Sequence, residues 1–127
     1  MPEQHLFEYA VIRIVPKVER EEFFNVGVVL YCAKEKFLQA KFQLNEDRLR
    51  AFCKKTDLDE LKEYLHAFEQ ICAGGNDAGP IGKLPVAERF RWLTATRSTV
   101  VQTSKVHPGL CTNATDTLAK LFEQLVA

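Results

Sequence analysis

One arginine stands inside an otherwise apolar stretch of the sequence, and it is the residue best placed to do chemistry. Arg13 lies in the run from Tyr9 to Val15, whose other members are all aliphatic or aromatic. A guanidinium in a buried strand is costly unless it is paired, and its planar donors match carboxylates and phosphates. Arg13 is therefore either structural or a fixed anion-binding group. In the structural case, it forms an ion pair with Glu21 or Glu22, or its side chain reaches the rim of the sheet.

Three other polar residues could join Arg13 and Glu22 on one face of a sheet. Arg97 precedes the segment expected to form the last strand, and Asn25 and Gln102 could add neutral hydrogen bonds. Their convergence is a hypothesis, because the register of the strands cannot be derived from the sequence. The candidate anion or partner site thus consists of Arg13, Glu22, Asn25, Arg97 and Gln102, and the sequence identifies no catalytic residue.

The histidines and cysteines do not form a recognisable metal motif. His107 and Cys111 are four positions apart, and His66 and Cys72 are six apart, whereas structural zinc needs four ligands with tighter pairing. Pairings of His107 with a nearby serine or cysteine are too common to indicate a nucleophile. We therefore expect no metal and no cofactor, and we expect His5 and His107 to lie at the surface.

The elements expected to position these residues begin with four strands. The runs Phe7–Val15 and Val26–Cys32 are too apolar for edge strands, so they predict the centre of a sheet. Phe37–Phe42 alternates and carries lysines, which favours an edge strand in a hairpin with the second run. Ser98–Ser104 is half polar and is placed at or near an edge. Pro108-Gly109 is typical of a type II turn.

The helices are recognised by their caps. Asn45 predicts the start of a first helix and Asp57 that of a longer second one, while Pro85 opens a short helix and Asn113 caps the last. The glycine-rich connection 74–83 is expected to be the most mobile internal segment. The order is strand-strand-strand-helix-helix-(helix)-strand-helix, which predicts an α+β fold. We expect a four-stranded, mostly antiparallel sheet with helices packed mainly on one face.

Length, charge and cysteine spacing limit the kinds of protein that this chain can be. The 127 residues suit one domain, 1–127, and 17 basic side chains balance 17 acidic ones, so nucleic acid is an improbable partner. No apolar run approaches the ~20 residues of a membrane helix, and the first residues have no secretory pattern. The four cysteines stand singly, which is typical of reduced thiols in a cytoplasmic protein.

Three stretches carry a family resemblance: YAVIRIVPKVEREEFFNVGVVLYC, AGPIGKLPVAERFRWLTATRSTVVQTSKVHPGLC and the closing LAKLFEQLV. They resemble the bacterial family catalogued as domain of unknown function 3037, over nearly the whole chain. The most specific parts are Arg13, Glu22 and Asn25-Val26-Gly27, with Arg97-Ser98-Thr99 and Gln102-Thr103-Ser104. The resemblance implies no established activity. It implies, as an association only, a kinase of the HipA toxin type as a partner.

The function expected from these observations is that of a small cytoplasmic interaction or ligand-binding module whose partner is another protein. The alternative is an enzyme or nucleotide-binding domain that acts on a phosphorylated substrate through Arg13 and Arg97. The sequence leaves open whether the protein is an enzyme.

Overall fold

The computed structural model describes residues 3–15, 24–50, 55–95 and 101–126 of the chain, in which five strands form an antiparallel sheet. The strand order is β3-β2-β1-β4, and β5 also pairs with β1, beyond the end of β4. The α+β fold and its antiparallel sheet are therefore confirmed. The strands are β1 (His5–Ile14), β2 (Phe24–Cys32), β3 (Phe37–Phe42), β4 (Val101–Thr103) and β5 (His107–Cys111).

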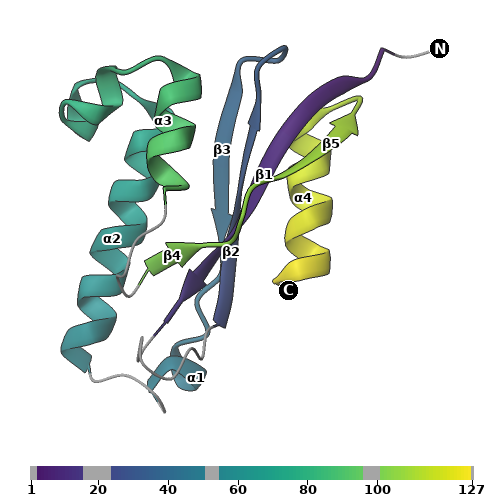
Figure 1. Ribbon diagram of the computed structural model, residues 1–127. Coiled ribbons are helices and arrows are strands. Elements are labelled where there is room, and N and C mark those ends of the chain that lie inside the picture. The colour runs from purple at the N-terminus through teal and green to yellow at the C-terminus, as the bar shows by residue number, and fades with distance from the viewer. Residues whose placement is uncertain (1–2, 16–23, 51–54, 96–100, 127) are drawn as a thin grey trace.

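The two apolar runs occupy the centre of the sheet, as predicted. Helices cover both faces of these strands (Figure 1), which explains why the residues on both faces are apolar. On one face, Ile12, Ile14 and Val29 pack against the apolar sides of α2 and α3. On the other face, Val28 and Leu30 pack against α4. The helices are α1 (Glu46–Arg50), α2 (Lys55–Ala73), α3 (Val86–Leu93) and α4 (Ala114–Leu125).

The expected turn at Pro108-Gly109 is wrong, because both residues belong to β5, where Gly109 pairs with Phe7 and Pro108 with Glu8. Proline is tolerated here because β5 pairs with β1 along one of its sides, and an edge strand can lack a backbone amide without losing a hydrogen bond of the ladder. Gly109 serves close packing rather than a turn, since a Cβ at this position would stand 2.5 Å from Cζ of Phe7.

The break between β4 and β5 is bridged by Ser104. The pairs Ile12–Thr103 and Tyr9–His107 show that one extra residue is accommodated between the two strands, which is a β-bulge. Across this bulge, the Ser104 amide donates to the Val11 carbonyl at 2.8 Å, and the Ser104 hydroxyl accepts from the Val11 amide at 2.8 Å. Ser104 thus keeps both backbone groups of Val11 bonded where the ladder is interrupted.

Most helices begin next to their predicted signals, but α2 already includes Lys55, two residues before its predicted start at Asp57. Asn113 caps α4, and its side-chain oxygen accepts from the Asp116 amide at 2.9 Å. Pro85 precedes α3, and α2 stops before Gly74, whose φ of 77° is favourable for glycine. The connection 74–83, expected to be the most mobile internal segment, forms two short 3-10 turns, Asn76–Ala78 and Ile81–Lys83. Its mobility stays a prediction.

The buried Arg89 joins α3 to the end of α2. Its Nη1 donates to the carbonyls of Ile71 at 2.8 Å and Cys72 at 2.9 Å, and its Nε donates to the Leu84 carbonyl at 3.1 Å. The carbonyls of Ile71 and Cys72 belong to the last turn of α2 and need partners from outside the helix. Arg89 supplies them together with a positive charge at the negative end of the helix.

Three cysteines within the described part of the chain, Cys32, Cys72 and Cys111, are buried and free of disulfides, as expected from their single spacing. Cys53 lies outside the described residues. Among the helices described, none combines the length and the apolar character required to cross a bilayer.

Candidate functional site

Three of the predicted site residues lie side by side in the sheet. Arg13 on β1 is directly opposite Asn25 on β2 and directly opposite Gln102 on β4. Residues paired in this way on adjacent strands point to the same face of a sheet. The hypothesis of convergence is thus supported for these three residues, which we call the Arg13 row.

The Arg13 row lies beside the end of α4. The Asn25 side-chain amide donates to the Leu125 carbonyl at 3.2 Å, which ties β2 to the last turn of α4. A β-bulge interrupts the β1–β2 pairing between Ile12 and Arg13, and Val26 is the extra residue. Asn25 also lines a pocket of about 130 Å³ between β2, α1 and the chain end after α4.

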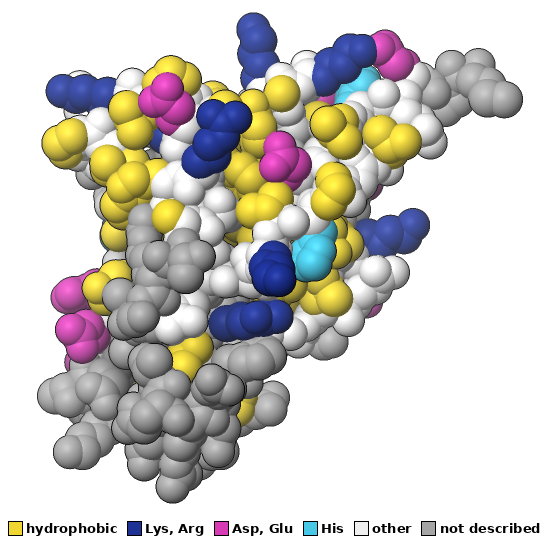
Figure 2. Space-filling view, viewed as in Figure 1, with side chains coloured by type: hydrophobic (Ala, Val, Ile, Leu, Met, Phe, Trp, Pro, Cys, Tyr) yellow, Lys and Arg dark blue, Asp and Glu magenta, His cyan; other side chains and the backbone are white. Residues whose placement is uncertain are grey.

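The Arg13 side chain is half-buried, and its Nε is fully buried. Glu22 and Arg97, the other two predicted site residues, lie outside the described residues, as does Glu21. The choice between a structural ion pair and an anion site therefore stays a prediction. Figure 2 shows Lys and Arg side chains and one His over the strand edge made by β4 and β5, where Lys105 and His107 are exposed.

An apolar pocket of about 300 Å³ lies between α2, α3 and β4. Tyr64 and Trp92 are its most exposed aromatic residues, with 49% and 38% of their surface accessible. Hydrophobic side chains over the α2 and α3 side are visible in Figure 2. The residues deeper in the pocket are Phe68, Ile71, Leu93 and Val101. This volume is at the lower end of the range for small-molecule sites.

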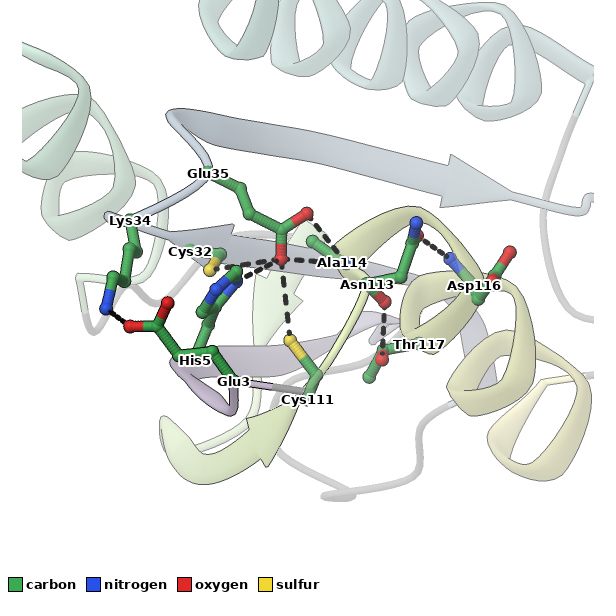
Figure 3. A network of polar contacts seen from close by, with 10 residues as sticks. All are labelled: Glu3, His5, Cys32, Lys34, Glu35, Cys111, Asn113, Ala114, Asp116 and Thr117. Atoms are coloured by element: carbon green, nitrogen blue, oxygen red, sulfur yellow. Dashed lines mark hydrogen bonds and ion pairs between the residues drawn. The ribbon is translucent and has the colours of Figure 1, made fainter. Parts of the chain in front are cut away.

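A second polar cluster, which the sequence did not reveal, surrounds Glu35 in the turn between β2 and β3 (Figure 3). Its Oε2 atom lies 3.0 Å from Nδ1 of His5, 3.7 Å from Sγ of Cys32 and 3.8 Å from Sγ of Cys111. Both carboxylate oxygens accept from the amide of Ala114, the first residue of α4, at 3.1 Å. We call His5, Cys32, Glu35 and Cys111 the Glu35 cluster.

The surroundings shift the ionisation of this cluster. Hydrogen bonds from His5 and then from the Ala114 amide hold the pKa of Glu35 below its usual value. Burial raises the pKa of the Cys111 thiol. His5 was expected at the surface, but its side chain is only 19% exposed because it packs against Glu35.

No spacing rule could have found the Glu35 cluster, because its members come from β1, β2, the following turn and β5. The one available signal was the alternation of β2, which places Cys32 on the same face as Val28 and Leu30. Predicting the cluster also required β5, whose Pro108-Gly109 pair indicated a turn instead of a strand.

Comparison with known proteins gives one result that decides the family. The sequence pattern of the family described as protein of unknown function DUF3037 matches residues 9–126. The chain belongs to the DUF3037 family. The match confirms the predicted resemblance and includes the Arg13 row, together with Cys32, Glu35 and Cys111. His5 precedes the matched DUF3037 region. No curated protein and no solved structure matches the chain.

Proposed function

We propose that this DUF3037 protein is an interaction or ligand-binding module that recognises an anionic group at the Arg13 row. The observation that carries the proposal is the pairing of Arg13 with Asn25 on one side and Gln102 on the other. A guanidinium flanked by two side-chain amides offers many hydrogen-bond donors in one place. Such a set complements a carboxylate or a phosphate, for which arginine is the preferred partner.

The placement of the row also supports binding. The Arg13 side chain is half-buried and its Nε is fully buried, so it loses less side-chain freedom on binding an anion than an exposed arginine would, and this preorganisation favours affinity. The pocket beside Asn25 provides a concave surface at one end of the row. The partner we expect is another protein that presents such a group, in line with the balanced charge of the chain.

The test combines a small probe with capture of the natural partner. Inorganic phosphate is titrated into the protein while the backbone amides are followed by NMR. We expect saturable shifts at Arg13, Asn25 and Gln102, and we expect Arg13→Ala to abolish them. Arg91→Ala is the matched control, because Arg91 is exposed on α3.

Affinity purification from the native host with mass spectrometry then compares the wild type with Arg13→Ala. Loss of the captured partner without a change in melting temperature supports a functional role for Arg13. A large fall in melting temperature in Arg13→Ala, with phosphate shifts absent from the wild type, indicates a structural ion pair and refutes the proposal.

The alternative function, an enzyme acting on a phosphorylated substrate through Arg13 and Arg97, uses the same row and is distinguished by turnover. A wild-type protein that releases phosphate from, or transfers it between, small phosphorylated compounds supports that alternative. Arg13→Ala and Arg97→Ala are the variants expected to lose such activity.

The apolar pocket between α2, α3 and β4 favours a second candidate, the binding of an apolar group. Trp92 is the single tryptophan of the chain and lines this pocket, so its fluorescence reports occupancy directly. A fluorescence titration with an uncharged aromatic probe is expected to saturate in the wild type. Ala67→Phe fills the pocket and should weaken binding, whereas Ala119→Phe on the exposed side of α4 is the control. An unsaturable signal would rule out this candidate.

A further inference from the structure

We propose that the Glu35 cluster binds one zinc ion, with His5 Nδ1, Cys32 Sγ, Glu35 Oε2 and Cys111 Sγ as ligands. The proposal goes beyond the anion site and runs against the expectation of no metal, which rested on spacing along the chain. In the fold, Glu35 Oε2 faces one imidazole and two sulfur atoms (Figure 3). The donor atoms of His5, Cys32 and Glu35 all lie within 4.8 Å of one another. Cys111 Sγ approaches Glu35 Oε2 but lies outside this set of three, so it must move inward to complete the tetrahedron.

The distances suit a small tetrahedral ion. A tetrahedron built with ordinary zinc bond lengths has oxygen–nitrogen edges of about 3.4 Å and oxygen–sulfur edges of about 3.6 Å. The corresponding separations from Glu35 Oε2 are 3.0 Å to His5 and 3.7 and 3.8 Å to the two cysteines. Shifts of a few tenths of an ångström would therefore bring these three edges to the lengths that zinc requires.

The donor types select among metals. Two thiolates and an imidazole favour zinc and other borderline-soft ions, whereas magnesium and calcium prefer sites made of oxygen alone. The ligands lie on the paired strands β1, β2 and β5 and in the turn after β2, so the sheet brings them near one another before a metal arrives. Side chains of His5 and Glu35 remain 19% and 24% exposed, which leaves a path from solvent.

A second layer of contacts orients the carboxylate. The Ala114 amide donates to Glu35, and Ala114 is fully buried at the first position of α4. Such a contact can remain on Oε1 while Oε2 binds the metal, as is common for carboxylate ligands. With both cysteines bound, all four positions are filled by protein. This is the arrangement of a structural site, one that ties the first strand, the β2–β3 turn and β5 to the start of α4.

The first experiment needs no variant. Full-length protein is reduced, stripped with a chelator and titrated with cobalt(II), which reports ligand type by its absorption. We expect saturation at one equivalent per chain, thiolate-to-cobalt charge-transfer absorption in the near ultraviolet, visible bands of tetrahedral intensity, and displacement by zinc. Absence of the charge-transfer absorption in the reduced, folded wild type overturns the proposal.

The second experiment assigns the ligands. Cys32→Ser and Cys111→Ser are each expected to weaken zinc binding by more than about 100-fold, because the loss of second-layer partners alone costs 10–100-fold. Cys72→Ser is the matched control, since Cys72 belongs to α2 and is buried in the core on the other face of the sheet. Circular dichroism confirms that each variant is folded. Wild-type affinity in Cys111→Ser, or an equal loss in Cys72→Ser, would overturn the four-ligand site.

Discussion

Replacing Arg89 with leucine removes three hydrogen bonds and a charge from the joint between α2 and α3. Arg89 is 8% exposed, and its guanidinium is bonded to the carbonyls of Ile71, Cys72 and Leu84. Leucine fills part of the same space but donates nothing. The carbonyls at the end of α2 would then lie in a buried region without their present donor.

The cost follows from the two carbonyls at the end of α2. A buried acceptor left unmatched costs about 1–3 kcal/mol, so Ile71 and Cys72 together predict a loss of about 2–6 kcal/mol. The lost charge at the helix C-terminus adds about 0.3–1 kcal/mol. Domains of this kind have a total unfolding free energy of about 5–15 kcal/mol. Arg89→Leu should therefore remove a large part of the stability.

The assay is urea unfolding at pH 7, followed by circular dichroism. Arg91→Leu is the matched control, because Arg91 belongs to the same helix and is exposed. We expect the control to change the unfolding free energy by less than about 0.5 kcal/mol. Arg89→Lys should recover only part of the loss, since an ammonium cannot reach the same acceptors as a fork of donors. Equal losses in Arg89→Leu and Arg91→Leu would refute the capping role.

Three further predictions test other parts of the fold. Gly109→Ala should lower the unfolding free energy by about 1–3 kcal/mol, measured in urea, because its methyl group would press on the Phe7 ring. The folded-state pKa of Glu35 is lowered, so its carboxylate stabilises metal-free protein near neutral pH, and this contribution is lost as the pH falls through that pKa. Melting temperature should thus fall more steeply with acid in the wild type than in Glu35→Gln; parallel curves would contradict this. Burial raises the pKa of Cys72 to about 12, so iodoacetamide at pH 8 should label it only after unfolding, as mass spectrometry can test.

The prediction of the fold was correct where the local sequence pattern and the tertiary environment favour the same structure. β3 was predicted at its observed ends, Phe37 and Phe42, because alternation and flanking turn residues act over short distances. The Asn113 cap was recognised for the same reason. β5 was missed because Pro108 and Gly109 have a strong preference for turns. The pairing with β1 overrides that preference, since Gly109 leaves room for the Phe7 ring.

The candidate site residues likewise include a group that could be predicted from the sequence and a group that could not. An arginine in an apolar strand is conspicuous in a sequence, so the Arg13 row was proposed from Arg13 outward, and the register supports its neighbours Asn25 and Gln102. Glu35 gave no such signal, because a glutamate in a turn is ordinary. Its environment is created by β5 and by the start of α4, and neither contact is local in the chain.

Both clusters meet the same helix, which gives α4 a central place in the molecule. At its first residue, the Ala114 amide donates to Glu35, and at its last residue, the Leu125 carbonyl accepts from Asn25. Between these ends, Leu118 and Phe122 bury the apolar side of α4 against β2. The helix is therefore held by apolar contacts along its length and by polar contacts at both ends. We expect a structural change in either cluster to shift α4, because the helix is closely packed against the sheet.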